Sequence, residues 1–198
     1  MRLRREFYLQ DDVVAVARQL LGKVLCTRIG GSTTRVVITE TEAYGGAGDR
    51  ASHAYGNRRT PRTEPMFATG GTAYVYLCYG MHHLFNVVVG ERDEPLAVLI
   101  RAGEPFAGTE LMRQRRKRPR AGKSLLAGPG CLAQALGITT ADSGISLLGR
   151  RIWLEDRGLA VAPSEFVAGP RVGVGYAAED AARPYRFRIR PGRRFDSG

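Results

Sequence analysis

The chain has 198 residues, of which 43% are hydrophobic and 25% charged, and this predicts a single domain over residues 1–198 with one core. The longest uninterrupted apolar runs span about six residues, far fewer than a bilayer crossing needs. The basic N-terminal stretch MRLRREFYLQDD is not followed by an apolar segment, so no secretion signal is expected. We therefore expect a cytoplasmic protein, nucleoid-associated if the source is bacterial, without a membrane partner.

Cysteine and charge content narrow the class of protein further. Cys26, Cys78 and Cys131 lie far apart and form no C-x-x-C pair, which argues against a disulfide framework and against a cysteine-rich zinc site. The net charge of +11 and the pI near 10.2 favour a polyanionic partner such as nucleic acid. All but three of the 30 basic residues are arginine, and a bias of this kind can also reflect genomic base composition.

The first predicted element is an amphipathic helix over residues 11–21 (DDVVAVARQLL). Its apolar residues fall on one face, Asp11 or Asp12 can cap its N-terminus, and Gly22 can end it. We expect this helix to be structural.

Two strands are predicted next, over residues 23–29 and 33–42, around a Gly-Gly-Ser turn whose glycines tolerate positive φ. The side-chain period of two places Glu40 and Glu42 on one face of the second strand, with Tyr44 as a candidate third member. Alternation alone does not decide which glutamate carries chemistry.

The middle of the chain combines a long loop with a predicted β-hairpin. Residues 45–71 are rich in Gly, Pro, Thr and Arg without a sustained period, and a loop of that length usually has a functional task. Residues 72–79 and 82–89 are aromatic and β-branched runs joined by a Gly-Met pair, which predicts a hairpin with Tyr79 near its tip. Another buried strand is predicted over residues 96–101.

The C-terminal half is predicted to be mixed. Residues 106–118 favour a helix that ends in the basic block RQRRKRPR (residues 113–120), which is typical of a solvated segment and is also a candidate phosphate contact. A Gly-Pro turn opens a short helix over residues 128–138. Short strands are predicted over residues 151–155, 171–174 and 185–190. The pattern as a whole predicts an α/β fold of the mixed α+β kind, with a curved, largely antiparallel sheet, flanking helices and a protruding hairpin.

Several well-known site types are absent from the sequence. It contains no phosphate loop, no G-x-G-x-x-G, no H-E-x-x-H and no G-x-S-x-G motif, and it lacks the zinc motifs of a nucleobase deaminase. Cys78, His82 and His83 are a poor metal set because adjacent strand residues point to opposite faces. We therefore expect neither a metal nor a cofactor.

The remaining polar and aromatic residues suit a nucleobase taken out of a duplex. Such an enzyme needs aromatic faces for stacking, a carboxylate and a side chain that fills the vacated space. Tyr44 and Tyr76 can sandwich a base, although tyrosines in strands are more often core residues with a solvated hydroxyl.

A series of motifs then gives the sequence a family resemblance. In chain order these motifs are ETEAY, DRASH, TPR, MF, GTAYVYLCYGMHHLFN, VLIRAGEP, GP-x-x-L-x-QALGI and RVGVGYA. From about Gln19 to Arg190 they resemble the alkyladenine (3-methyladenine) DNA glycosylase family, the mammalian-type methylpurine DNA glycosylases. The resemblance selects Glu42 over Glu40 as the general base.

The resemblance implies further roles. Arg101 would fix the nucleophilic water and the target phosphate, and Tyr79 would wedge into the minor groove. Asn86 would exclude normal guanine by clashing with its 2-amino group. The implied pocket residues are Tyr44, His53, Tyr76 and Asn86, with backbone groups of Ala51 and Val172. The candidate DNA contacts are Tyr79, Met81, His82, Arg115, Arg116 and Lys117. His82 stands where other members carry tyrosine.

The implied function is a monofunctional DNA glycosylase that flips damaged purines from double-stranded DNA and starts base excision repair. Its substrates would be 3-methyladenine and 7-methylguanine, with hypoxanthine and ethenoadenine as further candidates. A lyase step needs an amine, and none of the three lysines lies in the central stretch. We expect a monomer. The alternatives are a non-catalytic binder of damaged or bent DNA and an RNA-binding module that stacks unpaired bases.

Overall fold

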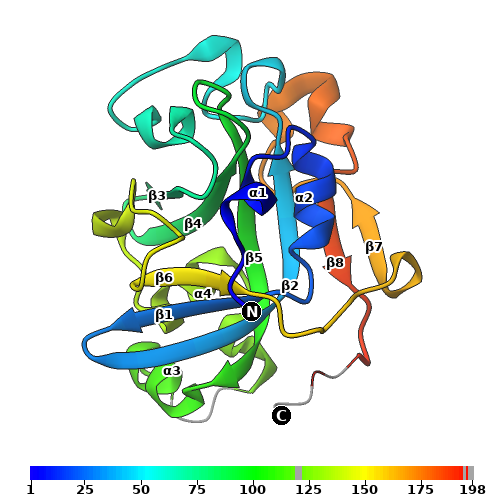
Figure 1. Ribbon diagram of the computed structural model, residues 1–198. Coiled ribbons are helices and arrows are strands. Elements are labelled where there is room, and N and C mark those ends of the chain that lie inside the picture. Colours follow the sequence, from blue (N-terminus) through cyan, green and yellow to red (C-terminus); the bar gives the residue numbers. More distant parts are fainter. Residues whose placement is uncertain (119–121, 194, 196–198) are drawn as a thin grey trace.

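One curved antiparallel sheet organises the fold, as seen in a computed structural model that describes residues 1–118, 122–193 and 195 (Figure 1). The strand order is β3-β4-β5-β2-β1-β6, and β8 joins β2 and pairs with β7. The strands are β1 Val24–Ile29, β2 Ser32–Tyr44, β3 Ala73–Cys78, β4 His82–Val89, β5 Leu96–Ala107, β6 Ile152–Glu155, β7 Phe166–Gly169 and β8 Arg186–Ile189. The helices are α1 Arg5–Tyr8, α2 Val13–Gln19, α3 Thr109–Arg115 and α4 Pro129–Leu136. The predicted mixed α+β fold is confirmed.

The sheet curls because β2 changes partners along its length. Its first half pairs with β1, its second half pairs with β8, and β5 follows it nearly throughout. Register shifts interrupt the β2–β5 pairing around Glu40, and such bulges bend a strand. Figure 1 shows the β1–β2 hairpin lying nearly crosswise to the part of β2 beside β8. Glu40 and Glu42 lie in the part of β2 that pairs with β5 on one side and β8 on the other.

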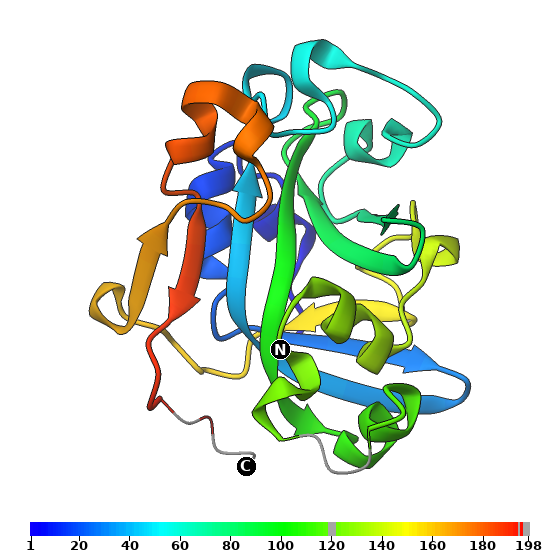
Figure 2. The same cartoon turned by 180° about the vertical axis from the view of Figure 1, so that it is seen from behind.

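The predicted N-terminal helix is confirmed as α2, with Asp12 as its cap. The Asp12 carboxylate accepts hydrogen bonds from the amides of Val14 and Ala15, which would otherwise have no partner in the first turn. Its apolar face, including Val16, packs into the main core. In the rear view, α3 and α4 lie against the opposite side of the β1–β2 hairpin from the N-terminal segment (Figure 2). The core is therefore built on both faces of the sheet.

The loop and hairpin of the middle region are confirmed as well. Between β2 and β3 the chain forms only short 3-10 turns, the longest being Glu64–Phe67. Strands β3 and β4 pair from Ala73 with Val87 to Cys78 with His82. Tyr79 and Gly80 form the turn at the tip with positive φ angles of 50° and 69°.

Two element predictions are wrong. Residues 106 and 107 belong to β5 and not to a helix, because Gly108, with φ of 78°, ends the strand before α3 begins. Residues 171–174 form a bend and not a strand; the strand that pairs with β8 is β7, which stops before Pro170. Residues 119 and 120 of the predicted basic block lie outside the described residues.

Among the residues that the structure describes, no helix has both the length and the apolar character required to cross a bilayer.

Candidate active site

Glu42 lies near the end of β2 with its side chain fully buried, yet its partners are polar. The Val172 amide donates to Oε1 at 2.8 Å, the Tyr44 hydroxyl donates to Oε2 at 2.9 Å, and Arg101 Nη1 donates to Oε2 at 3.3 Å. Each contact is a donation to a carboxylate oxygen, so the acid is oriented by hydrogen bonds rather than enclosed by hydrocarbon.

A second carboxylate holds Arg101 in place. Glu40 Oε1 accepts from Arg101 Nε at 3.0 Å and from Arg186 Nε at 2.6 Å, and its side chain is 12% exposed. The guanidinium of Arg101 therefore bridges the two glutamates that strand alternation placed on one face. Glu40 orients the arginine, and the arginine reaches Glu42.

A buried ion pair fixes the chain next to Glu42. The side chains of Arg171 and Asp49 are both fully buried; Arg171 Nη2 donates to Asp49 Oδ1 at 2.8 Å and Nη1 donates to Oδ2. Arg171 Nη1 also donates to the Ala43 carbonyl at 2.9 Å, and its guanidinium lies 4.9 Å from the centre of the Tyr44 ring. Because Val172 follows directly, this pair sets the position of the amide that contacts Glu42.

The charged state of Asp49 is stabilised within that pair. Burial by itself would raise the pKa of Asp49, but hydrogen bonds from Arg171 and from the amides of Gly45 and Ala51 outweigh it and lower that pKa. Asp49 thus stays an anion opposite the Arg171 cation.

A narrow cavity of about 40 Å³ opens beside Tyr44. At roughly 10–15 Å³ for one water, it has room for about three water molecules and is too small for a purine. Its lining residues are Tyr44, Ala51, Ser52, His53, Met66, Tyr74, Tyr76, Asn86 and Ala97. Glu42 does not line the cavity but lies one hydrogen bond behind it, through Tyr44. The structure therefore brings together five of the six predicted pocket residues, and Val172 adjoins them through Glu42.

Aromatic side chains make up one wall of this cavity. The His53 ring meets the Tyr76 ring edge-on at 4.6 Å between centroids, and Tyr74 lies 5.5 Å from Tyr76. Burial raises the pKa of the Tyr44 and Tyr76 hydroxyls above their ordinary range, so both are neutral donors. Burial, followed by the charges of Arg62 and Arg58, lowers the pKa of His53 to about 4.

Asn86 and Ala51 are held by contacts of their own. Asn86 Nδ2 donates to the Tyr74 carbonyl at 3.0 Å and to the Leu84 carbonyl at 3.4 Å, which fixes the orientation of the buried amide. The amide of Ala51 donates to Asp49 and its carbonyl accepts from Tyr176. Any contact of Ala51 with a bound base would have to use a remaining lone pair of that carbonyl.

The tip of the β3–β4 hairpin projects into solvent. The side chains of Tyr79 and Met81 are 88% and 69% exposed, which is unusual for large apolar residues. Next to them, His82 lies against α4 so closely that a Cβ on Gly130 would come within 3.0 Å of its Cγ. The hairpin next to Tyr79 is therefore packed against α4, while Tyr79 itself is exposed.

Comparison with known proteins shows to which family the chain belongs. The profile of the family described as Methylpurine-DNA glycosylase (MPG) matches residues 6–193. The chain belongs to that family. Methylpurine-DNA glycosylases are DNA N-glycosylases, hydrolases of base excision repair, and the resemblance stated from the motifs is confirmed.

Bacterial relatives provisionally named 3-methyladenine DNA glycosylase agree with this assignment. The relative from Chlamydia felis is 45% identical over 186 residues, or 93% of this chain and 94% of its own length. The relative from Desulfitobacterium hafniense is 45% identical over 193 residues, covering 94% of each chain. The relative from Clostridium perfringens strain 13 is 43% identical over 198 residues, covering 96% of each.

The basic residues expected to touch DNA in this glycosylase differ in their surroundings. Arg115 donates to the carbonyls of Ile29 and Ala135, so it joins α3 to the sheet and to α4 instead of facing solvent. Arg116 donates to the Gln134 side chain at 2.7 Å, while Lys117 is exposed at the end of α3. These contacts favour a structural role for Arg115.

Sequence reasoning missed Arg171, Asp49 and Tyr74 in this methylpurine-DNA glycosylase. Tyr74 Oη lies 2.9 Å from His53 Nδ1, and its neighbour Tyr76 had been singled out instead. The RVGVG motif contained Arg171, but it was interpreted as a strand. Among the described residues no group of three or more His, Cys, Asp or Glu side chains could hold a metal ion.

Proposed function

We propose that the protein flips alkylated purines, 3-methyladenine and 7-methylguanine, out of duplex DNA and hydrolyses their N-glycosidic bond without a lyase step. Hypoxanthine and ethenoadenine are further candidate substrates. The observation that carries the proposal is Glu42, a buried carboxylate aligned by three donors directly behind an aromatic cavity.

Glu42 is proposed to act as the general base. A water positioned at its oxygens attacks C1′ of the flipped nucleotide, gives its proton to Glu42, and the electron pair of the C1′–N9 bond leaves with the base. The negative charge of Glu42 also stabilises the oxocarbenium-like sugar in the transition state. Arg101, held by Glu40, would orient the water and contact the target phosphate.

The cavity favours a base that leaves without an added proton. A purine alkylated at N3 or N7 is a cation, so the departing electron pair neutralises it. A cation between the rings of Tyr44 and Tyr76 also gains about 0.5–2 kcal/mol of cation–π attraction. His53, with its pKa lowered to about 4, is neutral at physiological pH and a poor acid for a neutral base.

Asn86 is proposed to exclude normal guanine, and Tyr79 is proposed to stabilise the duplex from which the base has been flipped. The fixed amide of Asn86 would clash with the 2-amino group of guanine, because its Nδ2 is bound to the backbone and it cannot turn away. Tyr79 at the exposed hairpin tip would fill the space that the flipped nucleotide leaves. Since the DNA-free cavity is smaller than a purine, the aromatic wall must open as the base enters.

The monofunctional assignment rests on the positions of the lysines. Among the residues that the structure describes, no lysine lines the cavity from which a Schiff base with the sugar could form. Lys23 Nζ is bound to Asp156 at 2.6 Å.

The test of the proposed base is Glu42→Gln. The variant should bind a 3-methyladenine duplex with the affinity of the unchanged protein but lose at least about 10²-fold in single-turnover excision, the scale of a lost general base. Glu40→Gln is the matched control and should lose less, because Glu40 acts only through Arg101. An unchanged single-turnover rate in Glu42→Gln would show that another group activates the water.

The same assay separates the competing functions. Methylated duplex is incubated with the protein and treated with mild alkali, which breaks strands at abasic sites, and duplex treated without protein gives the background. A non-catalytic binder would leave the strands intact, and an RNA-binding module would prefer single strands to duplex. Four duplexes, each with one of the four candidate bases, then rank the substrates by released base.

A further inference from the structure

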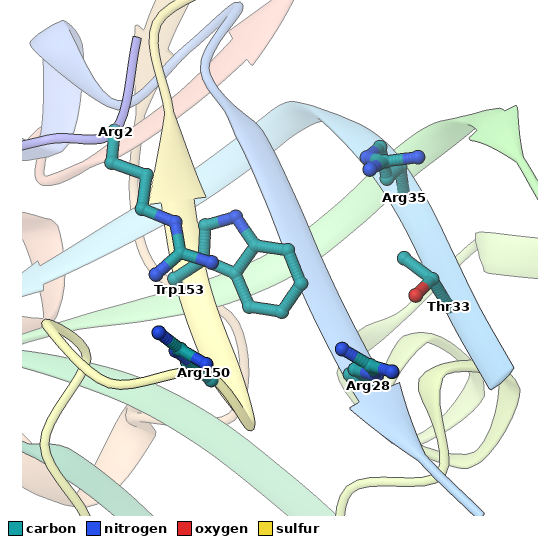
Figure 3. A pocket seen from close by; sticks show the side chains of 6 residues that line it. All are labelled: Arg2, Arg28, Thr33, Arg35, Arg150 and Trp153. Atoms are coloured by element: carbon teal, nitrogen blue, oxygen red, sulfur yellow. The ribbon is translucent and has the colours of Figure 1, made fainter. Parts of the chain in front are cut away.

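A second and larger hollow, of about 450 Å³, lies away from Glu42 on the surface of the β1, β2 and β6 strands (Figure 3). We call it the arginine groove. Its lining residues are Arg2, Arg28, Thr33, Arg35, Arg150 and Trp153. Figure 3 shows the arginines arranged around the indole of Trp153, with Arg2 above it and Arg28 and Arg35 across from it.

Strand alternation places the groove on the opposite face of the sheet from the hairpin tip. Thr27 pairs with Thr34, and Thr27 Oγ1 donates to the Leu136 carbonyl of α4, so that face is covered by the helix. The next residues, Arg28 and Arg35, project from the other face. Since α4 also packs against His82 next to the hairpin tip, the sheet lies between Tyr79 and the groove.

The arginines of the groove form no ion pair within the described residues, although the charge of Arg35 is felt at Glu155. Within the described residues, none of its four arginines has a carboxylate within 4.0 Å. The nearby acid, Glu155, already accepts from Trp153 Nε1 at 2.7 Å and from Arg157 Nε at 2.7 Å. The Nε atom of Arg35 is buried without a hydrogen-bond partner in the described structure.

Trp153 holds part of this charge in a fixed orientation. The guanidinium of Arg2 lies 4.5 Å from the centre of the indole, and its Nη1 donates to the Gly149 carbonyl at 3.0 Å. Stacking on an aromatic face leaves the N–H edges of a guanidinium free to point outward. The arginine groove thus presents oriented guanidinium N–H donors above the apolar face of Trp153.

Phosphate is the anion that this arrangement fits. Guanidinium forks match phosphate oxygens in pairs, and four like charges around one hollow repel each other unless an anion lies between them. Three of the four arginines are exposed, so the hollow is open to a polymer. A phosphate every few ångströms along nucleic acid would satisfy several of them at once.

We propose that the arginine groove is a second DNA-binding site, which holds the backbone phosphates of one duplex segment while the Tyr79 face holds another. The proposal rests on the proposed docking of DNA at Tyr79 and goes beyond it. A protein with two such faces would pass between DNA segments without release into solution.

The experiment measures bridging of two duplexes by the full chain. A donor-labelled duplex with a tetrahydrofuran abasic analogue saturates the Tyr79 face, and an acceptor-labelled undamaged duplex is then titrated while energy transfer is recorded. Arg28→Ser/Arg150→Ser removes two exposed charges from the groove. Arg5→Ser/Arg188→Ser removes two exposed charges elsewhere and is the control.

The groove variant should bind the second duplex at least tenfold more weakly than the unchanged protein and the control. Its slope of log affinity against log salt should fall by about 2, at roughly 0.9 for each lost phosphate contact. Single-turnover excision on a short duplex should stay unchanged, which separates the groove from the active site. If Tyr79→Ala still holds the first duplex as tightly as the unchanged protein, that result counts against the proposed docking face and not against the groove.

Four results would overturn the proposal. The unchanged protein could fail to bind a second duplex at low salt, or the groove variant could bridge as well as the control. An acidic peptide of equal charge could displace the second duplex as effectively as unlabelled DNA, which would show that the groove does not select phosphate. Sedimentation must also show one protein for two duplexes, because two proteins would mean bridging by a dimer.

Discussion

His53 couples the stability of the cavity to pH. Its pKa in the folded protein is about 4, mainly because of burial, against 6.5 for an unperturbed histidine. Between these values the unfolded chain binds more protons than the folded one, so the neutral ring contributes stability that is fully present above about pH 6.5 and is lost as the pH falls towards 4.

The expected result is a fall in the urea midpoint between pH 7.5 and pH 5 that is larger in the unchanged protein than in His53→Gln. The variant removes the titrating ring and leaves the other groups that respond to acid. If both proteins lose the same stability over that interval, His53 does not titrate as proposed.

Loss of Arg171 should lower the stability of the fold, although Arg171 itself does not line the cavity. Arg171→Met leaves the Asp49 carboxylate buried without its cation, and breaking a buried ion pair costs about 3–5 kcal/mol. The free energy of unfolding in urea should fall by that amount. Arg188→Met, on the exposed side of β8, should stay within about 0.5 kcal/mol of the unchanged protein. An equally small effect for Arg171 would mean that solvent reaches Asp49.

The hairpin is the element in which local strain and the proposed function meet. Tyr79 and Gly80 both have positive φ, the geometry of a turn that favours Asn-Gly, and a tyrosine in this conformation costs about 1 kcal/mol. Strain of this kind persists where a side chain is needed for function.

Tyr79→Asn should therefore raise the melting temperature while lowering the single-turnover excision rate. Tyr79→Phe is the matched control: it keeps the aromatic wedge and the strain, and should keep both values close to those of the unchanged protein. If Tyr79→Asn excises the base at the rate of the unchanged protein, the Tyr79 side chain does not support base flipping.

Elements with a clear period could be predicted from sequence, and those defined by long-range contacts could not. Alternation predicted both hairpin strands, and the capping aspartate predicted α2. The segment at 171–174 has the composition of a strand, but its first side chain turns inward to Asp49, 122 residues earlier in the chain. No local pattern reports a partner at that distance.

The residues of the candidate site also fall into two groups, those that the sequence could predict and those that it could not. Glu42, Tyr44 and Tyr76 lie on strands whose faces could be predicted, and motif resemblance selected among them. Tyr74 was missed although a side-chain period of two puts it on the face of Tyr76, and it lies at the boundary between core and cavity.

At the scale of the whole molecule, residues 1–198 are proposed to form one cooperative unit. Trp153, the single tryptophan of the chain, lies on β6 at one edge of the sheet, far along the strand order from β3. Its fluorescence and the far-ultraviolet circular dichroism should change at the same urea concentration. Separate transitions would divide the chain into two independently folding parts. The proposed monomer should sediment as a particle of about the chain mass, 21.6 kDa.

The small volume of the cavity before DNA arrives has a consequence for the life of the enzyme in the cell. Loose adenine or hypoxanthine from nucleotide turnover meets no receptacle of its own size. Under the proposed function, free purines should therefore compete poorly with a damaged base that the DNA duplex delivers to the cavity. Added free adenine should accordingly inhibit single-turnover excision only weakly.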